Sequence, residues 1–283
     1  MSGSGAAPSR AGLPVRPVLA HAEPVMGTVV SFAVLPGDLP EAELWSALDA
    51  ARAVLHRANA VFSTWDPRSP VSRLRRGAAQ PGPLPAAVAE VAALCRAARE
   101  ASGGWFDPWA MPGGYDPTGL VKGWAVDGAL AVLRQAGLPA AMVNGGGDLA
   151  AFGAPAPGQR WRAGIRHPWR AAALAAIVEV RAAVATSGTY ERGAHLIDPR
   201  TGLPGRRAVS ATVTGPSLAL ADALATALAV GGDAALEAIA ALESYDGYLI
   251  RPDGSETSTG GFAFVPTGQA SASEVTGRRP APE

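Results

Sequence analysis

Asp222 and Thr226 lie four residues apart and are the strong oxygen ligands of an otherwise apolar segment, SLALADALATALAV. In a helix this spacing places both side chains on one face, about one turn apart. A carboxylate and a hydroxyl so placed form half of a site for Mg²⁺, a hard cation that takes oxygen ligands. The structural alternative is that Thr226 bonds back to its own helix and Asp222 pairs with an arginine.

The segment from Asp116 to Asp127 is the second candidate, and it contains Lys122, the only lysine of the chain. Asp-Pro pairs and glycines precede an apolar helical stretch, and the free N–H groups at such a helix start suit an anionic ligand. Lys122 falls in the first turn, where the helix dipole disfavours a cation. A ligand phosphate or a carboxylate partner would offset this penalty; the alternative is a surface lysine without a role.

Two further segments have the composition of a site. His195 lies between SGTYER and DPRTG, which are rich in hydrogen-bond donors and turn formers, although a lone histidine is also often structural. The glycines of VNGGGDL (145–147) permit tight passage of the backbone beside a ligand or another strand. They do not form the dinucleotide-binding fingerprint, and a structural turn is the alternative.

Periodicity predicts the elements that position these residues. Strands are expected at 28–35, 140–144, 160–166, 175–187 and 207–215, and as a closing pair at 247–252 and 260–265. Helices are expected at 40–62, 85–101, from near 120 to 135, at 217–232 with Ser217 as N-cap, and at 233–242. Because helices and strands do not alternate regularly, the expected class is α+β, one domain with a mixed or antiparallel sheet and flanking helices.

Composition excludes several classes of protein. The formal net charge is zero, without blocks of like charge, which disfavours nucleic-acid binding. The single cysteine rules out an intrachain disulfide framework. We find no signal-peptide core and no apolar run that could span a bilayer, so we expect a cytoplasmic protein without membrane insertion. Residues 1–20 and 267–283 are expected to be disordered tails, and 21–266 the folded domain.

Taken in order, nine motifs make the chain resemble the ApbE-type FAD:protein FMN transferases. They are MGTVVSF, FSTWDPRSPVSRL, GGWFDP, DPTGLVKGWAVD, MVNGGGDL, WRAGIRHP, TSGTYER, HLIDPRTGLP and DALAT, and they span roughly residues 26–228. The resemblance implies Mg²⁺-dependent cleavage of the FAD diphosphate, attachment of FMN to a Ser or Thr hydroxyl of an acceptor protein, and release of AMP. It also implies a single α+β domain.

The resemblance also implies the role of individual residues. The implied flavin contacts are Met26, Trp65 (often Tyr in the family), Phe106, Asp107 and Pro108. Asp116 and Lys122 are implied to face the FAD, and His195 to lie near the diphosphate with Leu196 beside it. The implied Mg²⁺ ligands are the carbonyl of Gly119 and the side chains of Asp222 and Thr226. Either His195 or a metal-held carboxylate such as Asp222 could help the acceptor hydroxyl to lose its proton.

Three departures from the family pattern bear on the acceptor and the compartment. Arg75 stands where the family usually has Asn, and WAMPGGY (109–115) is shorter than the corresponding stretch of many members. Many bacterial members are exported lipoproteins, whereas this sequence shows neither signal nor anchor. Two other functions therefore stay open: a Mg²⁺-dependent FAD pyrophosphatase that transfers FMN to water, and an FAD-binding protein without turnover.

Overall fold

The computed structural model describes residues 18–80, 82–188, 196–205 and 207–266. The helices are α1 (Glu41–Phe62), α2 (Pro70–Arg75), α3 (Ala86–Ala101), α4 (Thr118–Gln135), α6 (Leu218–Gly231) and α7 (Asp233–Ala240). The strands are β1 (Leu19–Val25), β2 (Thr28–Leu35), β3 (Ala140–Gly145), β4 (Leu149–Phe152), β5 (Arg162–Arg166), β6 (Leu174–Glu179), β7 (Ala183–Gly188), β8 (Ser210–Gly215), β9 (Asp246–Ile250) and β10 (Glu256–Ser258). Among these helices, none is long and apolar enough to cross a bilayer.

An eight-stranded sheet in the order β1-β2-β3-β4-β7-β8-β9-β10 forms the centre of the described structure. All neighbouring strands in it are antiparallel. Strands β5 and β6 pair only with each other, as a separate antiparallel ribbon. The predicted α+β class with an antiparallel sheet and flanking helices is confirmed.

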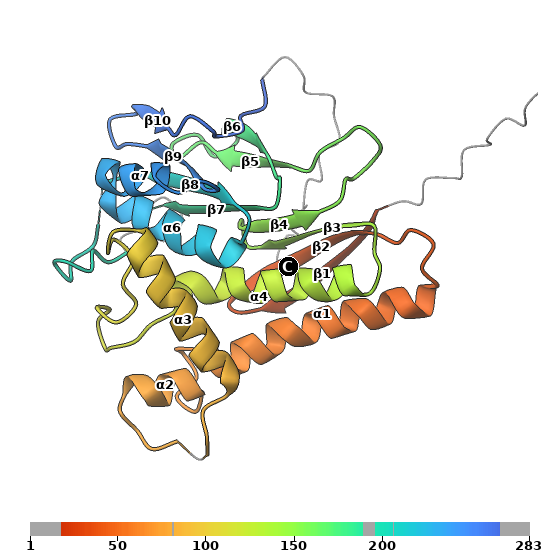
Figure 1. Cartoon of the computed structure of the whole chain (residues 1–283), viewed down its shortest axis with the longest axis horizontal. Helices are drawn as coiled ribbons and strands as arrows, with labels where there is room; N and C mark the ends of the chain where they lie inside the picture. Colours follow the sequence, from red (N-terminus) through yellow and green to blue (C-terminus); the bar gives the residue numbers. More distant parts are fainter. Residues whose placement is uncertain (1–17, 81, 189–195, 206, 267–283) are drawn as a thin grey trace, which may run out of the picture.

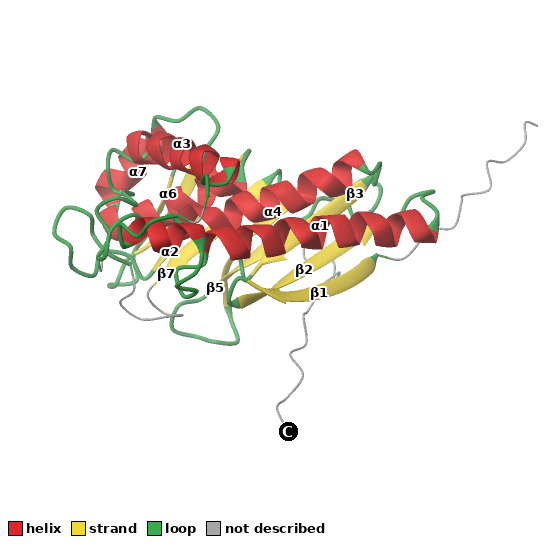
Figure 2. Cartoon of the chain, turned by 90° about the horizontal axis from the view of Figure 1, so that it is seen from below, coloured by secondary structure: helices red, strands yellow, loops and turns green. Residues whose placement is uncertain are grey.

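The helices cover one face of the large sheet, and α1 and α4 lie side by side on it (Figures 1 and 2). The side chains of β2 alternate between the two faces, as period-2 geometry requires. Val30, Phe32 and Val34 belong to the core between sheet and helices, whereas Ala33 belongs to a second core on the opposite face. There the β5–β6 ribbon contributes Ile165 and Val178. The sheet is therefore buried on both sides over much of its area.

The first strand of the sheet corrects the predicted boundary of the N-terminal tail. Leu19 and Ala20 belong to β1, which pairs with β2 through a two-residue turn at Met26 and Gly27. Both turn residues have positive φ, 55° at Met26 and 70° at Gly27, as the mirror-image hairpin turns demand. The prediction missed β1 because Pro24 and the polar residues beside it obscure the alternation. Proline is tolerated here because β1 is an edge strand.

Of the closing pair of strands, the one predicted at 247–252 is observed as β9, but the prediction of a strand at 260–265 is wrong. The partner of β9 is β10, a three-residue strand whose side chains are all exposed. Phe264 forms only an isolated bridge to Val178. The aromatic rings of Phe262 and Phe264 pack on Tyr248 instead, at centroid distances of 5.5 and 5.1 Å. An apolar run is thus used here for packing and not for strand pairing.

The buried carboxylate of Glu23 links β1 to α1 through hydrogen bonds. Glu23 accepts hydrogen bonds from Arg52 and from His56 Nε2, the latter at 2.8 Å. These bonds, from Arg52 first and His56 second, lower the pKa of Glu23 to about 2. The hairpin that places Met26 is therefore held to the helical layer by an ionised side chain.

Candidate active site

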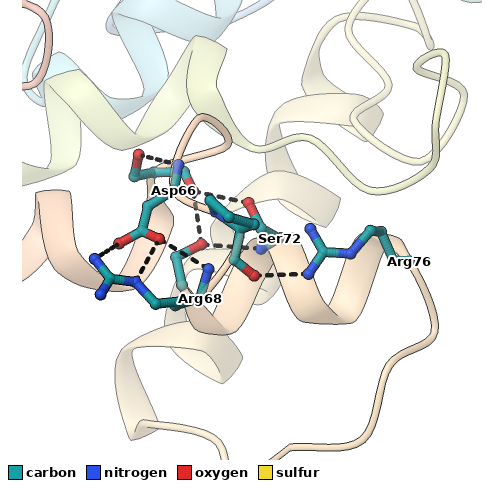
Figure 3. Close-up of polar contacts among 7 residues, drawn as sticks. Asp66, Arg68, Ser72 and Arg76 are labelled. Atoms are coloured by element: carbon teal, nitrogen blue, oxygen red, sulfur yellow. Dashed lines mark hydrogen bonds and ion pairs between the residues drawn. The ribbon is translucent and has the colours of Figure 1, made fainter.

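Trp65 lies on the loop between α1 and α2. Polar contacts of Asp66, Arg68, Ser72 and Arg76 hold this loop (Figure 3). The Ser63 carbonyl accepts from Ser72 Oγ at 2.9 Å, and Ser63 Oγ accepts from the Asp66 N–H at 3.1 Å. The Asp66 carboxylate in turn accepts from the backbone N–H and the guanidinium of Arg68 at 2.8 and 3.2 Å, which lowers its pKa. On this ordered loop the Trp65 side chain is 94% exposed, so a flat apolar ring is presented to solvent.

The segment after α3 holds three of the other predicted flavin contacts, Phe106, Asp107 and Pro108. Phe106 is buried, and Asp107 is bound to Arg99 in the last turn of α3, with Nε to Oδ2 at 2.7 Å. The carbonyl of Pro108 accepts a hydrogen bond from the Asp116 N–H at 2.8 Å. The Asp107 carboxylate therefore fixes the loop, and its neighbours connect this loop to the start of α4.

Asp116 is engaged on both oxygens at the start of α4. Its Oδ1 accepts from the N–H and the hydroxyl of Thr118, at 3.1 and 2.6 Å, and its Oδ2 accepts from Arg75 Nη1 at 2.8 Å. Arg75 also donates to the Pro112 carbonyl at 2.7 Å. The helix begins at Thr118, two residues before the predicted start, because Asp116 satisfies the first free N–H. Arg75 thus joins α2, which follows the Trp65 loop, to the start of α4.

Lys122 forms an ion pair with Asp148, a residue that the sequence analysis did not select. Asp148 is 2% exposed, and its other oxygen accepts from the Thr186 N–H at 2.8 Å. Asp148 follows the glycine turn between β3 and β4, where Gly146 and Gly147 have φ of 74° and 112°. Asp148 is the carboxylate of the VNGGGDL motif, and this was the signal that could have found it. Lys122 therefore has a carboxylate partner, one of the two kinds of partner expected, and the pair connects α4 to the turn. Because α4 begins at Thr118, Lys122 lies in its second turn and not in the predicted first turn.

The three predicted metal ligands lie on the interface between α4 and α6. A Cβ at Gly119 would lie 3.6 Å from Thr226 Oγ1 and 3.2 Å from the Phe106 ring. Asp222, 5% exposed, accepts a hydrogen bond from the Gly123 N–H at 3.3 Å. Glycine at position 119 thus leaves open a space bordered by the Thr226 hydroxyl. Residues about a hundred positions apart in sequence meet in one place.

The close approach of α4 and α6 has two causes in the sequence. A Cβ at Gly123 would lie 2.4 Å from the Leu218 carbonyl oxygen, so only glycine permits this contact. Asp127 accepts from Ser217 Oγ at 2.9 Å and from the N–H groups of Leu218 and Ala219 at 3.1 and 3.0 Å. Burial raises the pKa of Asp127, and these hydrogen bonds oppose the rise. Ser217 is the N-cap residue of α6, as predicted, but its side chain makes no cap hydrogen bond. The Asp127 carboxylate of α4 accepts from the first N–H groups of α6 in its place.

These residues fit a Mg²⁺ ion. Across the described ranges no cluster of three His, Cys, Asp or Glu side chains could hold a metal. Mg²⁺ does not need such a cluster, because it usually keeps several waters and binds one or two carboxylates together with substrate phosphates. Asp222 offers one nearly buried carboxylate, and Gly119 and Thr226 border the same interface with neutral oxygens.

The remaining predicted residues are only partly covered by the structure. His195 lies outside the described residues. Leu196 is buried, and its carbonyl accepts from the Gly205 N–H at 2.8 Å, which closes the loop between them. Met26 is half-buried at the β1–β2 turn.

Comparison with known proteins gives the class to which this fold and site belong. The model of the ApbE family matches residues 26–113 and 114–249. The chain belongs to the ApbE family. Among solved structures, it is similar to the flavin transferase ApbE from Vibrio cholerae, with a TM-score of 0.73 and 23% identity, over 86% of this chain and 97% of that one. The apo form of the Pseudomonas stutzeri flavinyl transferase ApbE gives a TM-score of 0.71 and 25% identity, over 86% and 94%.

Curated relatives share sequence over part of their length. The FAD:protein FMN transferase of Rhodobacter capsulatus is 38% identical over 172 residues, which are 57% of this chain and 31% of the relative. That of Salmonella typhimurium is 33% identical over 149 residues, 49% of this chain and 43% of the relative. The chain thus spans less than half the length of these two relatives.

Proposed function

We propose that this protein is an FAD:protein FMN transferase, which moves FMN from FAD to a Ser or Thr hydroxyl of an acceptor protein in a Mg²⁺-dependent reaction and releases AMP. The observation that supports it most is the α4–α6 interface, where Gly119, Asp222 and Thr226 meet. The family to which the chain belongs and the names of its relatives agree with this activity.

The reaction exchanges one phosphorus–oxygen bond for another. The acceptor oxygen bonds to the phosphorus of the FMN half, the bond to the AMP oxygen breaks, and the hydroxyl proton must leave. Mg²⁺ held by Asp222, Thr226 and the Gly119 carbonyl supplies charge neutralisation on the diphosphate. His195 and Asp222 are the two candidates for receiving the proton.

The other residues bind and orient the dinucleotide. Trp65 offers an exposed ring for stacking on the flavin, and Met26 and Phe106 offer apolar contacts. Lys122 contributes a positive charge near the glycine turn, and Asp148 holds it in place. Asp107 and Asp116 act through the loops that they fix, because their carboxylates are bound to Arg99 and Arg75.

The decisive experiment is to incubate the full chain with FAD, Mg²⁺ and a peptide bearing a flavinylation-type Thr segment. Mass spectrometry detects the FMN-peptide, and chromatography detects AMP. We expect both products, and both must disappear with EDTA. AMP without labelled peptide identifies a pyrophosphatase, and absence of AMP under all metal conditions identifies a binding protein.

Two variants test the metal assignment. We expect Asp222→Asn to abolish Mg²⁺-dependent turnover while FAD binding, followed by flavin fluorescence, persists. The matched control is Asp38→Asn, which makes the same change at an exposed position between β2 and α1. Normal turnover of Asp222→Asn refutes the assignment of this carboxylate.

A further inference from the structure

Two arginine side chains cover the buried indole ring of Trp105. The Cζ atom of Arg200 lies 3.4 Å from the ring centroid, and that of Arg207 lies 4.9 Å from it. Trp105 is only 5% exposed, although it precedes a surface loop. Arg200 also donates from Nη2 to the Gly103 carbonyl at 3.2 Å. The two guanidinium groups are therefore held in place at the surface by stacking.

The charge of these two groups is not neutralised within the described part of the chain. There, neither Arg200 nor Arg207 has a carboxylate oxygen within 4.0 Å, whereas Arg75 and Arg99 are paired with Asp116 and Asp107. Both Arg200 and Arg207 are exposed. A stacked guanidinium keeps its N–H edge available for a planar, two-bonded contact with a carboxylate. The chemistry that complements this surface is a pair of acidic side chains.

The loop that contains Arg200 has a fixed shape. The Asp198 N–H donates to the Leu203 carbonyl at 2.8 Å, and the Asp198 carboxylate accepts from the Arg200 N–H at 2.9 Å. Leu203 on the same loop is 65% exposed. Figure 1 shows this segment as the teal loop that projects at the left of the molecule. A projecting loop whose turn is closed by hydrogen bonds, with one apolar and one cationic side chain, suits contact with another protein.

This surface adjoins the candidate active site. Trp105 is followed in sequence by Phe106, whose ring lies 3.2 Å from the position of a Cβ at Gly119. The loop begins at Leu196, directly after His195. A polypeptide that brings a hydroxyl to this site therefore has the loop within reach on one side.

We propose that Arg200, Arg207 and Leu203 form a docking surface for an acidic segment of the acceptor protein, next to the residue that receives FMN. This rests on the proposed function, since it names a feature of the acceptor. A protein partner fits better than the FAD diphosphate because both arginines are exposed, whereas Asp222 at the predicted metal site is buried. A peptide chain is large enough to contact both places at once.

The test compares three peptides with the same acceptor Thr, flanked by Asp and Glu, by Gln, or by Lys. We expect the wild-type chain to have the lowest KM for the acidic peptide, and this preference to shrink with added salt. Arg200→Gln and Arg207→Gln should each raise that KM roughly two- to fivefold, the range of exposed ion pairs, with kcat and the KM for FAD unchanged. The matched control is Arg57→Gln, at an exposed position on α1.

Charge reversal separates recognition from loss of structure. The double variant Arg200→Glu, Arg207→Glu should lose the acidic peptide and gain preference for the Lys-flanked peptide, which a misfolded loop cannot do. Equal KM values of the wild type for all three peptides overturn the proposal. A changed KM for FAD with an unchanged peptide KM overturns it in favour of a diphosphate contact.

Binding without turnover distinguishes this proposal from the proposed function. Fluorescence anisotropy of the labelled acidic and Gln-flanked peptides is measured with the full chain, with FAD and Mg²⁺ omitted. The docking surface is supported if the wild-type chain binds the acidic peptide more tightly than the Gln-flanked peptide and Arg200→Gln loses this preference. This holds even where no FMN-peptide forms. Equal binding of the two peptides overturns the docking surface, whatever the catalytic result.

Discussion

Replacing Gly123 by alanine tests the contact between α4 and α6 on which the candidate metal site depends. The added Cβ would lie 2.4 Å from the Leu218 carbonyl oxygen and 2.8 Å from the Ala219 nitrogen. Both atoms belong to the backbone of the first turn of α6, so no side-chain rotation can relieve the overlap. The two helices must move apart, and with them Gly119 and the side chains of Asp222 and Thr226.

The size of the effect follows from two opposing terms. Alanine is favoured over glycine in a helix interior by about 1 kcal/mol. Overpacking a close contact costs about 1–3 kcal/mol, and the upper end applies where backbone must shift. We expect Gly123→Ala to lower the free energy of unfolding by about 2 kcal/mol.

The matched control is Gly128→Ala on the same helix. Its Cβ would meet only the Cγ1 methyl of Val54, at 3.1 Å, on the side of α1. A side-chain methyl can shift by a few tenths of an ångström, so we expect the free energy of unfolding to change by less than about 1 kcal/mol. Urea denaturation followed by circular dichroism measures both variants, and Mg²⁺-dependent AMP release should fall only in Gly123→Ala. If Gly123→Ala is as stable as Gly128→Ala, the α4–α6 contact is not as close as described.

Three other predictions follow from the contacts of single side chains. Asp127→Ala should lower the free energy of unfolding by about 2 kcal/mol through loss of the α6 cap, and Asp127→Asn by less; equal losses in thermal denaturation contradict the hydrogen-bonding role. Arg75→Met should raise the KM for FAD roughly tenfold by releasing Asp116, with partial rescue in Arg75→Lys; an unchanged KM refutes the positioning role. Because the folded pKa of Glu23 lies below its ordinary value of 4.5, its contribution to stability is present above pH 4.5 and is lost as pH falls towards 2. Urea denaturation across this range should show a weaker pH dependence for Glu23→Gln, and identical slopes argue against the Arg52 and His56 contacts.

Much of the secondary structure could be predicted from local pattern. The predicted helix at 40–62 is observed as α1 (Glu41–Phe62), and the predicted strand 28–35 as β2 (Thr28–Leu35). These segments are long or strongly periodic, and most of their buried apolar residues belong to the core between the sheet and the helices. β4, β10 and α2 were missed because each is only three to six residues long, too short for a period to be visible.

The residues of the candidate site were also partly accessible from sequence. The four-residue spacing of Asp222 and Thr226 predicted oxygen ligands. The expected position of Lys122 near a helix start predicted a carboxylate or phosphate partner for it. Asp148 was not selected, because a carboxylate after a glycine turn has no periodicity of its own. Asp127 was named only as the end of the segment 116–127, and its role in capping α6 was not predicted.

The sequence by itself determined the family, the main helices and strands, and the residue types available for binding a dinucleotide and a cation. Tertiary structure decided which of these residues act on one another. Lys122 meets Asp148, Asp127 meets the start of α6, and Arg75 meets Asp116, across 26, about 90 and 41 residues of chain. Such pairs depend on helix crossing and strand order, and these are set by the burial of whole faces and by a glycine at the closest contact.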